Sequence, residues 1–355
     1  MLTAAIFWYN KNEKYIYEVI FMRYMKTADV RSGSILARTI YGTDGRILIK
    51  ANTPLTEFLL EKLKGLGYPG LYLFDPGESH AVLKASLDEQ LRIEAAVHLQ
   101  NIDLDKCIYV ANEIVTQLLE KKNIATEVNR ISCYDLCTWT HSVDVCTFAV
   151  MCGIAMRYSD DELKELSQAA LLHDVGKTLV NRDVLTKPAK LTDDEYAMMK
   201  NHPLYGYDLL KKNTSLPPAV YRSVYEHHEN EDGSGYPRNI KGNNIHRYAK
   251  VIHAVDVYEA CTAIRPYKRP MNPADAIENL MAGYGSLYDM HVIDVLRSII
   301  VLYPLGREVL LSDGRTAVVM ENRREALSRP IVKACDGTVI DLLDILNITI
   351  LKLLD

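Results

Sequence analysis

The chain has 355 residues, a length typical of about two domains, and 48% apolar and 25% charged residues, as in ordinary globular proteins. Lysine and arginine number 41 against 46 aspartates and glutamates, and the net charge of -5 argues against a general DNA-binding protein. No apolar run approaches the roughly 18 residues of a membrane span, and residues 1–9 lack a basic leader, so we expect no membrane insertion.

The seven cysteines indicate the redox environment of the chain. They are odd in number, lie scattered through apolar helical contexts and show no C-x-x-C spacing. This pattern is typical of reduced thiols, so we expect a cytoplasmic protein.

Residues 1–26 are expected to be an extension of unknown role. They fit poorly with the pattern that follows, and Met22 and Met25 offer alternative starts.

A small α+β module is expected over residues 27–77. An Asp-Gly turn at residues 43–45 lies between two β-type runs and predicts a hairpin. Thr53 and Pro54 are expected to cap and start a helix, which ends before a strand at residues 71–74. The module contains no cluster of histidine, cysteine or carboxylate side chains, which favours an interaction or sensing role.

Residues 78–129 predict a helical connector. Apolar residues from Ile108 to Leu119 recur at helical spacing with charged residues between them. This face could also form the seam of a homodimer. His80 and His98 are isolated histidines of this segment, and we interpret them as solvated or packed residues.

The residues that predict chemistry lie in residues 130–303. His227 and His228 run into acidic residues and then into Asp232 to Pro237, a turn of Gly, Ser and Pro whose backbone can approach a substrate closely. Nitrogen ligands beside such a loop indicate a metal site with a binding loop attached. Because His-His pairs also occur by chance on helix ends, this interpretation depends on the other candidate ligands.

Three further candidates are expected at the ends of helices with clear starts. Capping boxes at residues 159–162 and 192–195 start helices that lead to His173 and Asp174 and to His202. The alternative for His173 and Asp174 is a capped helix end with a salt bridge.

His141 and Asp256 lie on apolar helical segments. A lone histidine there is usually structural, so the case for His141 depends on the other groups, whereas a carboxylate on an apolar face is costly unless it is paired or metal-bound. His253, three residues before Asp256, is expected to be packed near the site rather than to be a ligand. Imidazole and carboxylate suit first-row transition metals, and an aspartate can bridge two of them, so the candidate groups predict a two-metal centre: His141, His173, Asp174, His202, His227, His228 and Asp256.

Two basic features accompany these groups. Lys177 follows Asp174 by three residues and is placed to stabilise the extra charge of a transition state. The run from Arg265 to Arg269 is either a solvated surface loop or a phosphate-recognition element, for which arginine is suited.

The last part of the chain changes character. Residues 304–355 alternate short β-type runs with turn residues, which predicts a β-rich C-terminal segment with a structural role.

With these residues in view, the chain resembles the HD-GYP family, phosphodiesterases of the bacterial second messenger cyclic di-GMP within the HD superfamily. The resemblance covers about residues 130–300 and rests on His141-Ser142, His173 to Lys177, Lys187-Pro188, His202-Pro203, His227 to Glu229, Asp232 to Pro237, Asp256 and Arg265 to Lys268. It implies a mainly α protein with an all-helical catalytic domain that holds two divalent transition metals, iron first and manganese as the alternative. The small N-terminal module and the β-rich tail are a softer similarity.

The resemblance also implies roles for the matching residues. One metal would be held by His141, His173, Asp174 and Asp256, and the other by Asp174, His202, His227 and His228, with Asp174 as the bridge. Gly235, Tyr236 and Pro237 would line the guanine-nucleotide pocket, and Arg265 and Lys268 would contact phosphate.

One position departs from the members of the family that hold three metals. Those members have a glutamate one helical turn before the first histidine, where this chain has Cys137. A thiolate can ligate, but a buried thiol is the commoner case, so we expect two metals rather than three.

The expected reaction is hydrolysis of a phosphodiester. Two divalent ions about 3.5 to 4 Å apart can lower the pKa of a shared water and clamp the phosphate. We hypothesise that a metal-bridging hydroxide attacks cyclic di-GMP and gives linear pGpG, with a second cut to GMP left open. The alternatives are a catalytically inactive receptor that binds cyclic di-GMP without cutting it, and a phosphodiesterase of another cyclic dinucleotide.

Overall fold

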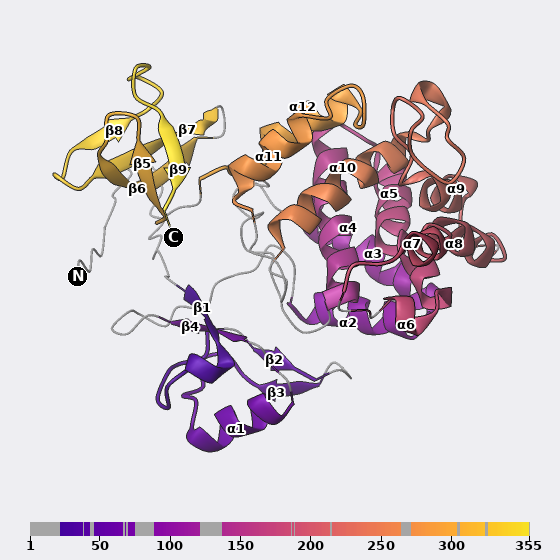
Figure 1. The fold of residues 1–355 in the computed structure, drawn as a ribbon, viewed down its shortest axis with the longest axis horizontal. Coiled ribbons are helices and arrows are strands. Elements are labelled where there is room, and N and C mark those ends of the chain that lie inside the picture. The colour runs from indigo at the N-terminus through magenta and orange to yellow at the C-terminus, as the bar shows by residue number, and fades with distance from the viewer. Residues whose placement is uncertain are drawn as a thin grey trace. The chain divides into compact units, whose positions relative to one another are not determined.

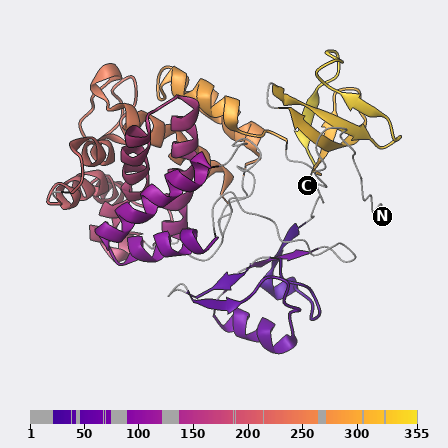
Figure 2. The ribbon, with the colours of Figure 1, turned by 180° about the vertical axis from the view of Figure 1, so that it is seen from behind.

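The structure is a computed structural model that describes residues 22–37, 39–42, 46–66, 68, 70–74, 89–120, 137–185, 187, 189–213, 215–263, 271–303, 306–323 and 326–354. The chain divides into two compact units, of which one comprises Met1–Lys84 with Tyr303–Asp355 and the other Ala85–Leu302. The second unit is helical (Figures 1 and 2), and the mainly α fold class predicted from the sequence is confirmed.

The N-terminal part contains short antiparallel strand pairs and one helix. β1 (Met22–Lys26) pairs with β4 (Gly70–Phe74), β2 (Ile40–Tyr41) pairs with β3 (Ile47–Ile49), and α1 (Glu57–Gly65) packs on this framework, with the single turn η1 at Thr27–Asp29. β1 lies in the stretch expected to be an extension.

The expected start of α1 at Thr53 and Pro54 is wrong. Pro54 forms an isolated β-bridge with Ile35, so this part of the chain is still extended. The helix begins after Thr56, whose hydroxyl accepts a hydrogen bond from the backbone N–H of Leu59. A threonine three residues further along therefore supplies the cap.

The helical unit is built around one central helix. Its helices are α2 (Glu89–Gln100), α3 (Leu104–Leu119), α4 (Cys137–Ala155), α5 (Asp160–Leu172), α6 (Arg182–Leu185), α7 (Asp193–Met199), α8 (His202–Leu210), α9 (Pro218–Glu226), α10 (Arg247–Thr262), α11 (Pro273–Met281) and α12 (Met290–Ile299), with the 3₁₀ turns η3 (Val175–Leu179) and η4 (Gly242–Asn244). α4 is buried from Thr140 to Cys152 and packs against α2, α5, α10 and α12. A helix that is apolar on all sides belongs in the core, and α4 carries His141 there.

The segment expected to be a connector is part of this core. Leu99 of α2 and Ile114 of α3 are fully buried in the same cluster as the residues of α4. A buried ion pair between Arg92 of α2 and Asp144 of α4 adds to the packing. Whether α2 and α3 also form a dimer seam stays a prediction.

The helix starts predicted from the two capping boxes are confirmed. Ser159 with Glu162 and Thr192 with Glu195 form reciprocal capping boxes at α5 and α7. Asn272 caps α11, and its side chain accepts a hydrogen bond from the N–H of Asp275. Because the starts of α5 and α7 are fixed by these caps, the positions of the residues at their C-terminal ends are fixed as well.

A close backbone approach joins the end of α5 to α8. A Cβ atom on Gly176 of η3 would lie 2.0 Å from the carbonyl oxygen of His202 and 2.5 Å from the backbone nitrogen of Gly206. Only glycine fits there, because any side chain would push η3 away from α8. Gly176 therefore sets the distance between the segment of His173 and Asp174 and the start of α8.

The C-terminal part is an antiparallel five-stranded sheet, as its alternating pattern predicted. The strands are β5 (Glu308–Leu311), β6 (Thr316–Arg323), β7 (Ala326–Ala334), β8 (Val339–Asp341) and β9 (Ile350–Leu353), in the order β8-β7-β6-β5-β9. Its own small core includes Val309, Leu311 and Val332. In the described parts of the chain, no helix combines the length and the apolar character that a bilayer crossing requires.

Replacing Gly176 by alanine tests the close approach of η3 and α8. We expect the unfolding free energy of the helical unit to fall by about 1–3 kcal/mol, because the new methyl group overlaps the backbone of α8. Calorimetry measures this as a lower Tm of the helical unit. The control is Gly65→Ala, at a helical position where a Cβ meets open space. An unchanged Tm in Gly176→Ala would contradict the tight packing.

Candidate metal centre

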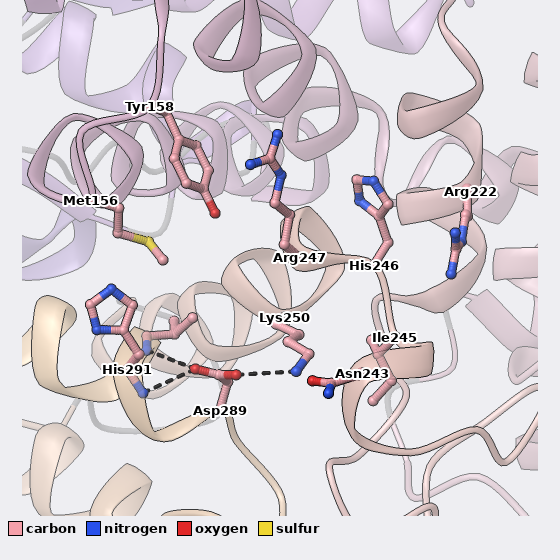
Figure 3. A pocket seen from close by; sticks show the side chains of 11 residues that line it. Met156, Tyr158, Arg222, Asn243, Ile245, His246, Arg247, Lys250, Asp289 and His291 are labelled. Atoms are coloured by element: carbon pink, nitrogen blue, oxygen red, sulfur yellow. Dashed lines mark hydrogen bonds and ion pairs between the residues drawn. The ribbon is translucent and has the colours of Figure 1, made fainter.

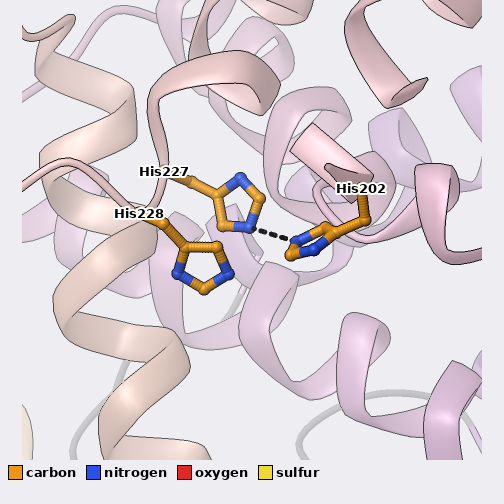
Figure 4. A group of neighbouring side chains, drawn as sticks. All are labelled: His202, His227 and His228. Carbon is orange, nitrogen blue, oxygen red and sulfur yellow. Dashed lines mark hydrogen bonds between the residues drawn. The ribbon is translucent and has the colours of Figure 1, made fainter. Parts of the chain in front are cut away.

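The seven groups singled out in the sequence come from five helices and meet at one place in the helical unit. Two clusters have ligand atoms within 4.8 Å of one another: His141, His173 and Asp174 in one, and His202, His227 and His228 in the other. Figure 4 shows the three histidines of the second cluster turned toward one another, with the Nε2 atoms of His202 and His227 3.4 Å apart. Each cluster has the ligand types that hold a divalent transition metal.

Asp174 lies between the two clusters. Its Oδ2 is 4.0 Å from Nε2 of His141 and 3.4 Å from Nε2 of His173, and its Oδ1 is 3.4 Å from Nε2 of His202. Asp256 of α10 belongs to the first cluster, since its Oδ1 is 3.0 Å from Nε2 of His141. Asp174 can therefore offer one oxygen to each side.

The ends of three helices orient three of the imidazoles. In each case Nδ1–H donates to the carbonyl oxygen three residues earlier: His173 to Ala170 at 2.8 Å, His202 to Met199 at 2.8 Å and His227 to Val224 at 2.7 Å. A carbonyl can only accept, so Nδ1 carries a proton, and in the neutral ring the lone pair is then on Nε2. All three histidines thus present a metal-binding nitrogen to the centre.

His141 is oriented by a side chain that the sequence analysis did not single out. Its Nδ1 forms a hydrogen bond with Oε2 of Glu259, a buried residue of α10. Glu259 follows Asp256 by three residues, so both carboxylates lie on the same face of the helix. The spacing from Asp256 could have pointed to Glu259 in the sequence. Its contact with His141 could not be predicted from a local pattern, because the two residues are 118 positions apart.

The imidazoles of the second cluster are neutral. Burial, together with the neighbouring histidines, holds the pKa of His227 and of His228 well below the usual range, and burial lowers the pKa of His202 to about 4. Neutral imidazole is the form that binds metal.

The first cluster is charged. Burial alone would raise the pKa of Asp174, but Lys177 and the histidines outweigh it and hold that pKa well below the usual range. Burial likewise opposes protonation of His141, yet Asp256 and Glu259 raise its pKa to about 10. A metal bound at Nε2 of His141 would replace this proton.

Two of the buried polar atoms that have no hydrogen-bond partner in the described structure belong to the candidate ligands. They are Nε2 of His173, which lies 3.4 Å from Oδ2 of Asp174, and Oδ1 of Asp174, which lies 3.4 Å from Nε2 of His202. Because an unsatisfied buried acceptor is costly, these atoms fit a site that a cation completes. The residues present therefore suit a pair of divalent metal ions.

The loop after His228 is closed on itself. A Cβ atom on Gly235 would lie 2.3 Å from the backbone nitrogen of Asn230 and 2.4 Å from the carbonyl oxygen of His228, so this glycine lets the loop contact its own backbone. The buried carboxylate of Glu229 accepts hydrogen bonds from the N–H groups of Arg238 at 2.6 Å and Ile240 at 3.2 Å. The approach of this loop to a substrate, which the sequence predicts, stays a prediction, and the structure adds the contact within the loop.

Tyr236 lies beside the second cluster. Its ring stacks on His228 with the ring centroids 4.7 Å apart and an interplanar angle of 30°. His253 is buried as expected, and its ring centroid is 6.4 Å from that of His228. Lys177 donates a hydrogen bond to Oδ2 of Asp174.

Some expected residues are not placed. Arg265 and Lys268 lie outside the described residues, as do His80 and the side chain of Cys137. The roles predicted for them stay predictions.

A separate cavity of about 470 Å³ opens at the ends of α4 and α9 and the starts of α10 and α12 (Figure 3). Its arginines and lysine are each paired with carboxylates: Arg222 with Glu226, Arg247 with Glu162, and Lys250 with Glu231 and Asp289. None of the seven candidate ligands lines it. The positive charge of this cavity is therefore already compensated.

Comparisons with known proteins identify the family of the chain. The sequence model of the HD domain family matches residues 114–292. The cyclic di-GMP phosphodiesterase PA4108 of Pseudomonas aeruginosa is 34% identical over 66% of this chain and 56% of its own length. The 3'3'-cGAMP-specific phosphodiesterase 2 of Vibrio cholerae is 33% identical over 39% of this chain and 27% of its own length. The chain thus spans little more than half of the first relative and about a quarter of the second.

A solved structure supports the fold. Bd1817, an HDG"Y"P protein of Bdellovibrio bacteriovorus, matches 79% of this chain and 99% of its own with a TM-score of 0.53. At 14% sequence identity this similarity concerns the fold alone. The resemblance to the HD-GYP group is confirmed, and since the family match covers half of its length, the chain belongs to the HD domain family.

Proposed function

We propose that the chain is a metal-dependent phosphodiesterase that hydrolyses cyclic di-GMP to pGpG, with the further cut to GMP left open. The observation that supports this most is the meeting of five imidazoles and two aspartates, of which His173 and Asp174 each have a buried polar atom without a hydrogen-bond partner in the described structure. The names of several relatives point to the same reaction, although the chain spans only part of their length.

The proposed ligand sets follow the two clusters. His141, His173, Asp174 and Asp256 would hold one ion, and Asp174, His202, His227 and His228 the other. Five imidazoles against two carboxylates favour iron over manganese. We propose two ions rather than three.

Divalent ions at these positions would supply positive charge to the phosphate oxygens and lower the pKa of a bound water towards neutrality. The residues of the chain prepare the site for this chemistry. Asp174 can serve both ions because its two oxygens face different clusters. The ammonium of Lys177 forms an ion pair with Oδ2 of Asp174. It would add a positive charge where the phosphate gains negative charge during the reaction.

The substrate would be held by the loop beside the second cluster. Gly235, Tyr236 and Pro237 are the proposed lining of the nucleotide pocket, and Arg265 and Lys268 the proposed phosphate contacts. The stacking of Tyr236 on His228 supports this, since it brings an aromatic face next to the candidate ligands. The similarity to a 3'3'-cGAMP-specific phosphodiesterase makes that cyclic dinucleotide the second candidate substrate.

The deciding experiment uses purified full-length protein loaded anaerobically with iron or manganese. We expect cyclic di-GMP to be consumed and pGpG to appear in mass spectrometry, and chelation to abolish the reaction. 3'3'-cGAMP is assayed in parallel. If cyclic di-GMP binds but is not consumed with either metal, the receptor alternative is favoured. If only 3'3'-cGAMP is consumed, that dinucleotide is the substrate.

The bridging role of Asp174 can be separated from the role of Lys177. Asp174→Ala should lose both metals, because one carboxylate serves both clusters. Lys177→Met should keep its metals and lower kcat about 10- to 1000-fold, because only charge stabilisation is lost. Metal analysis and steady-state kinetics measure the two effects. The control is Asp208→Ala, an exposed aspartate of α8, and full metal content in Asp174→Ala would rule out the bridge.

Glu259 is expected to set the affinity for the ion near His141. In Glu259→Gln the acceptor for Nδ1 of His141 keeps its shape but loses its charge, so His141 becomes a weaker ligand. We expect the affinity for one of the two ions to fall about 10- to 100-fold. Titration with metal followed by calorimetry measures this, with Glu278→Gln as an exposed control. Equal affinities in Glu259→Gln and in the unchanged protein would show that Glu259 has no such role.

A further inference from the structure

Lys200 is a half-buried cation beside the candidate metal centre. It is the C-cap residue of α7, two positions before His202. Within the residues that the structure describes, its ammonium has no carboxylate partner and contacts only aromatic rings. By contrast, Lys177, Lys187 and Lys250 all form ion pairs with aspartate or glutamate.

Two tyrosines hold this ammonium next to the candidate ligands. Nζ of Lys200 lies 4.7 Å from the ring centroid of Tyr196 and 5.3 Å from that of Tyr236. Tyr236 in turn stacks on His228. Lys200 is therefore two ring contacts away from a candidate ligand.

Among the residues that the structure describes, this positive charge has no counter-charge. Aromatic faces attract an ammonium, but they carry no net charge and replace only part of the lost hydration. An anion that enters the site would meet a cation already held in place. Lysine is well suited to phosphate because its ammonium is a compact point charge.

We propose that Lys200 binds the phosphodiester that is not being cleaved in a cyclic dinucleotide. This rests on the proposed function. Such a substrate carries two phosphodiesters in one ring, so a site that accepts it has to receive two negative charges. The metal clusters and Lys177 face one of them, whereas Lys200 lies outside both clusters and is one of the cations available for the other. Lys200 is thus a substrate-binding residue, and Tyr196 and Tyr236 position it.

The test compares substrates with two phosphodiesters and with one. Lys200→Gln should lower kcat/KM for cyclic di-GMP about 10- to 100-fold, mostly through KM, because one charge-assisted hydrogen bond is lost. Hydrolysis of bis(p-nitrophenyl) phosphate, which has a single phosphodiester, should be unaffected, and so should the metal content. Lys200→Arg should restore most of the loss. The matched control is Lys211→Gln, because Lys211 lies over the ring of Tyr207 at 5.2 Å at the opposite end of α8 from His202.

Three outcomes would overturn the proposal. Equal losses for both substrates would place Lys200 at the reacting phosphate, and no loss for either would remove it from the site. A loss that differs between cyclic di-GMP and cyclic di-AMP would mean that Lys200 contacts a base. If the unchanged protein hydrolyses nothing, the proposed function fails. The role of Lys200 in binding is then tested by calorimetry. The Kd for cyclic di-GMP should rise about 10- to 100-fold in Lys200→Gln.

Discussion

The candidate metal centre depends on imidazoles placed where helices end. At a helix C-terminus the last carbonyl groups have no N–H partner within the helix. His173, His202 and His227 satisfy such carbonyls with Nδ1 and leave Nε2 for a cation. One hydrogen bond therefore satisfies an unpaired carbonyl, selects the tautomer and aims the ring. Because the same arrangement occurs three times, the geometry of the site follows from the helix ends themselves.

The sequence allowed the local features to be predicted. Capping boxes at Ser159 and Thr192 and the strand pattern after Pro304 depend on neighbours in the chain, and the structure contains them. The sequence also led to the seven groups that the structure brings together, although their role as ligands stays a prediction. The contact of Glu259 with His141 and the place of Lys200 between two tyrosines depend on tertiary packing, which no local pattern encodes. The start of α1 was mistaken because Thr53 and Thr56 offer similar caps.

Charge is distributed unevenly across the helical unit. The cations of the cavity at the start of α10 are compensated by carboxylates, as is Lys177. Lys200 is not compensated within the described residues, and the first cluster pairs His141 with two carboxylates. Compensated pairs stabilise one arrangement of helices, whereas a half-buried cation without a counter-charge among the described residues is unfavourable until an anion binds.

The self-contact of the loop at Gly235 affects how a ligand would be recognised. The backbone at Gly235 lies against residues 228–230, and the carboxylate of Glu229 accepts hydrogen bonds from the N–H groups of Arg238 and Ile240. The shape of the loop therefore does not depend on anything outside the protein. The conformational entropy of ordering this segment is lost once, during folding, and not again at each encounter. A small molecule with few atoms can then bind tightly and selectively. Association of this kind should be fast, since no rearrangement of the loop has to precede it.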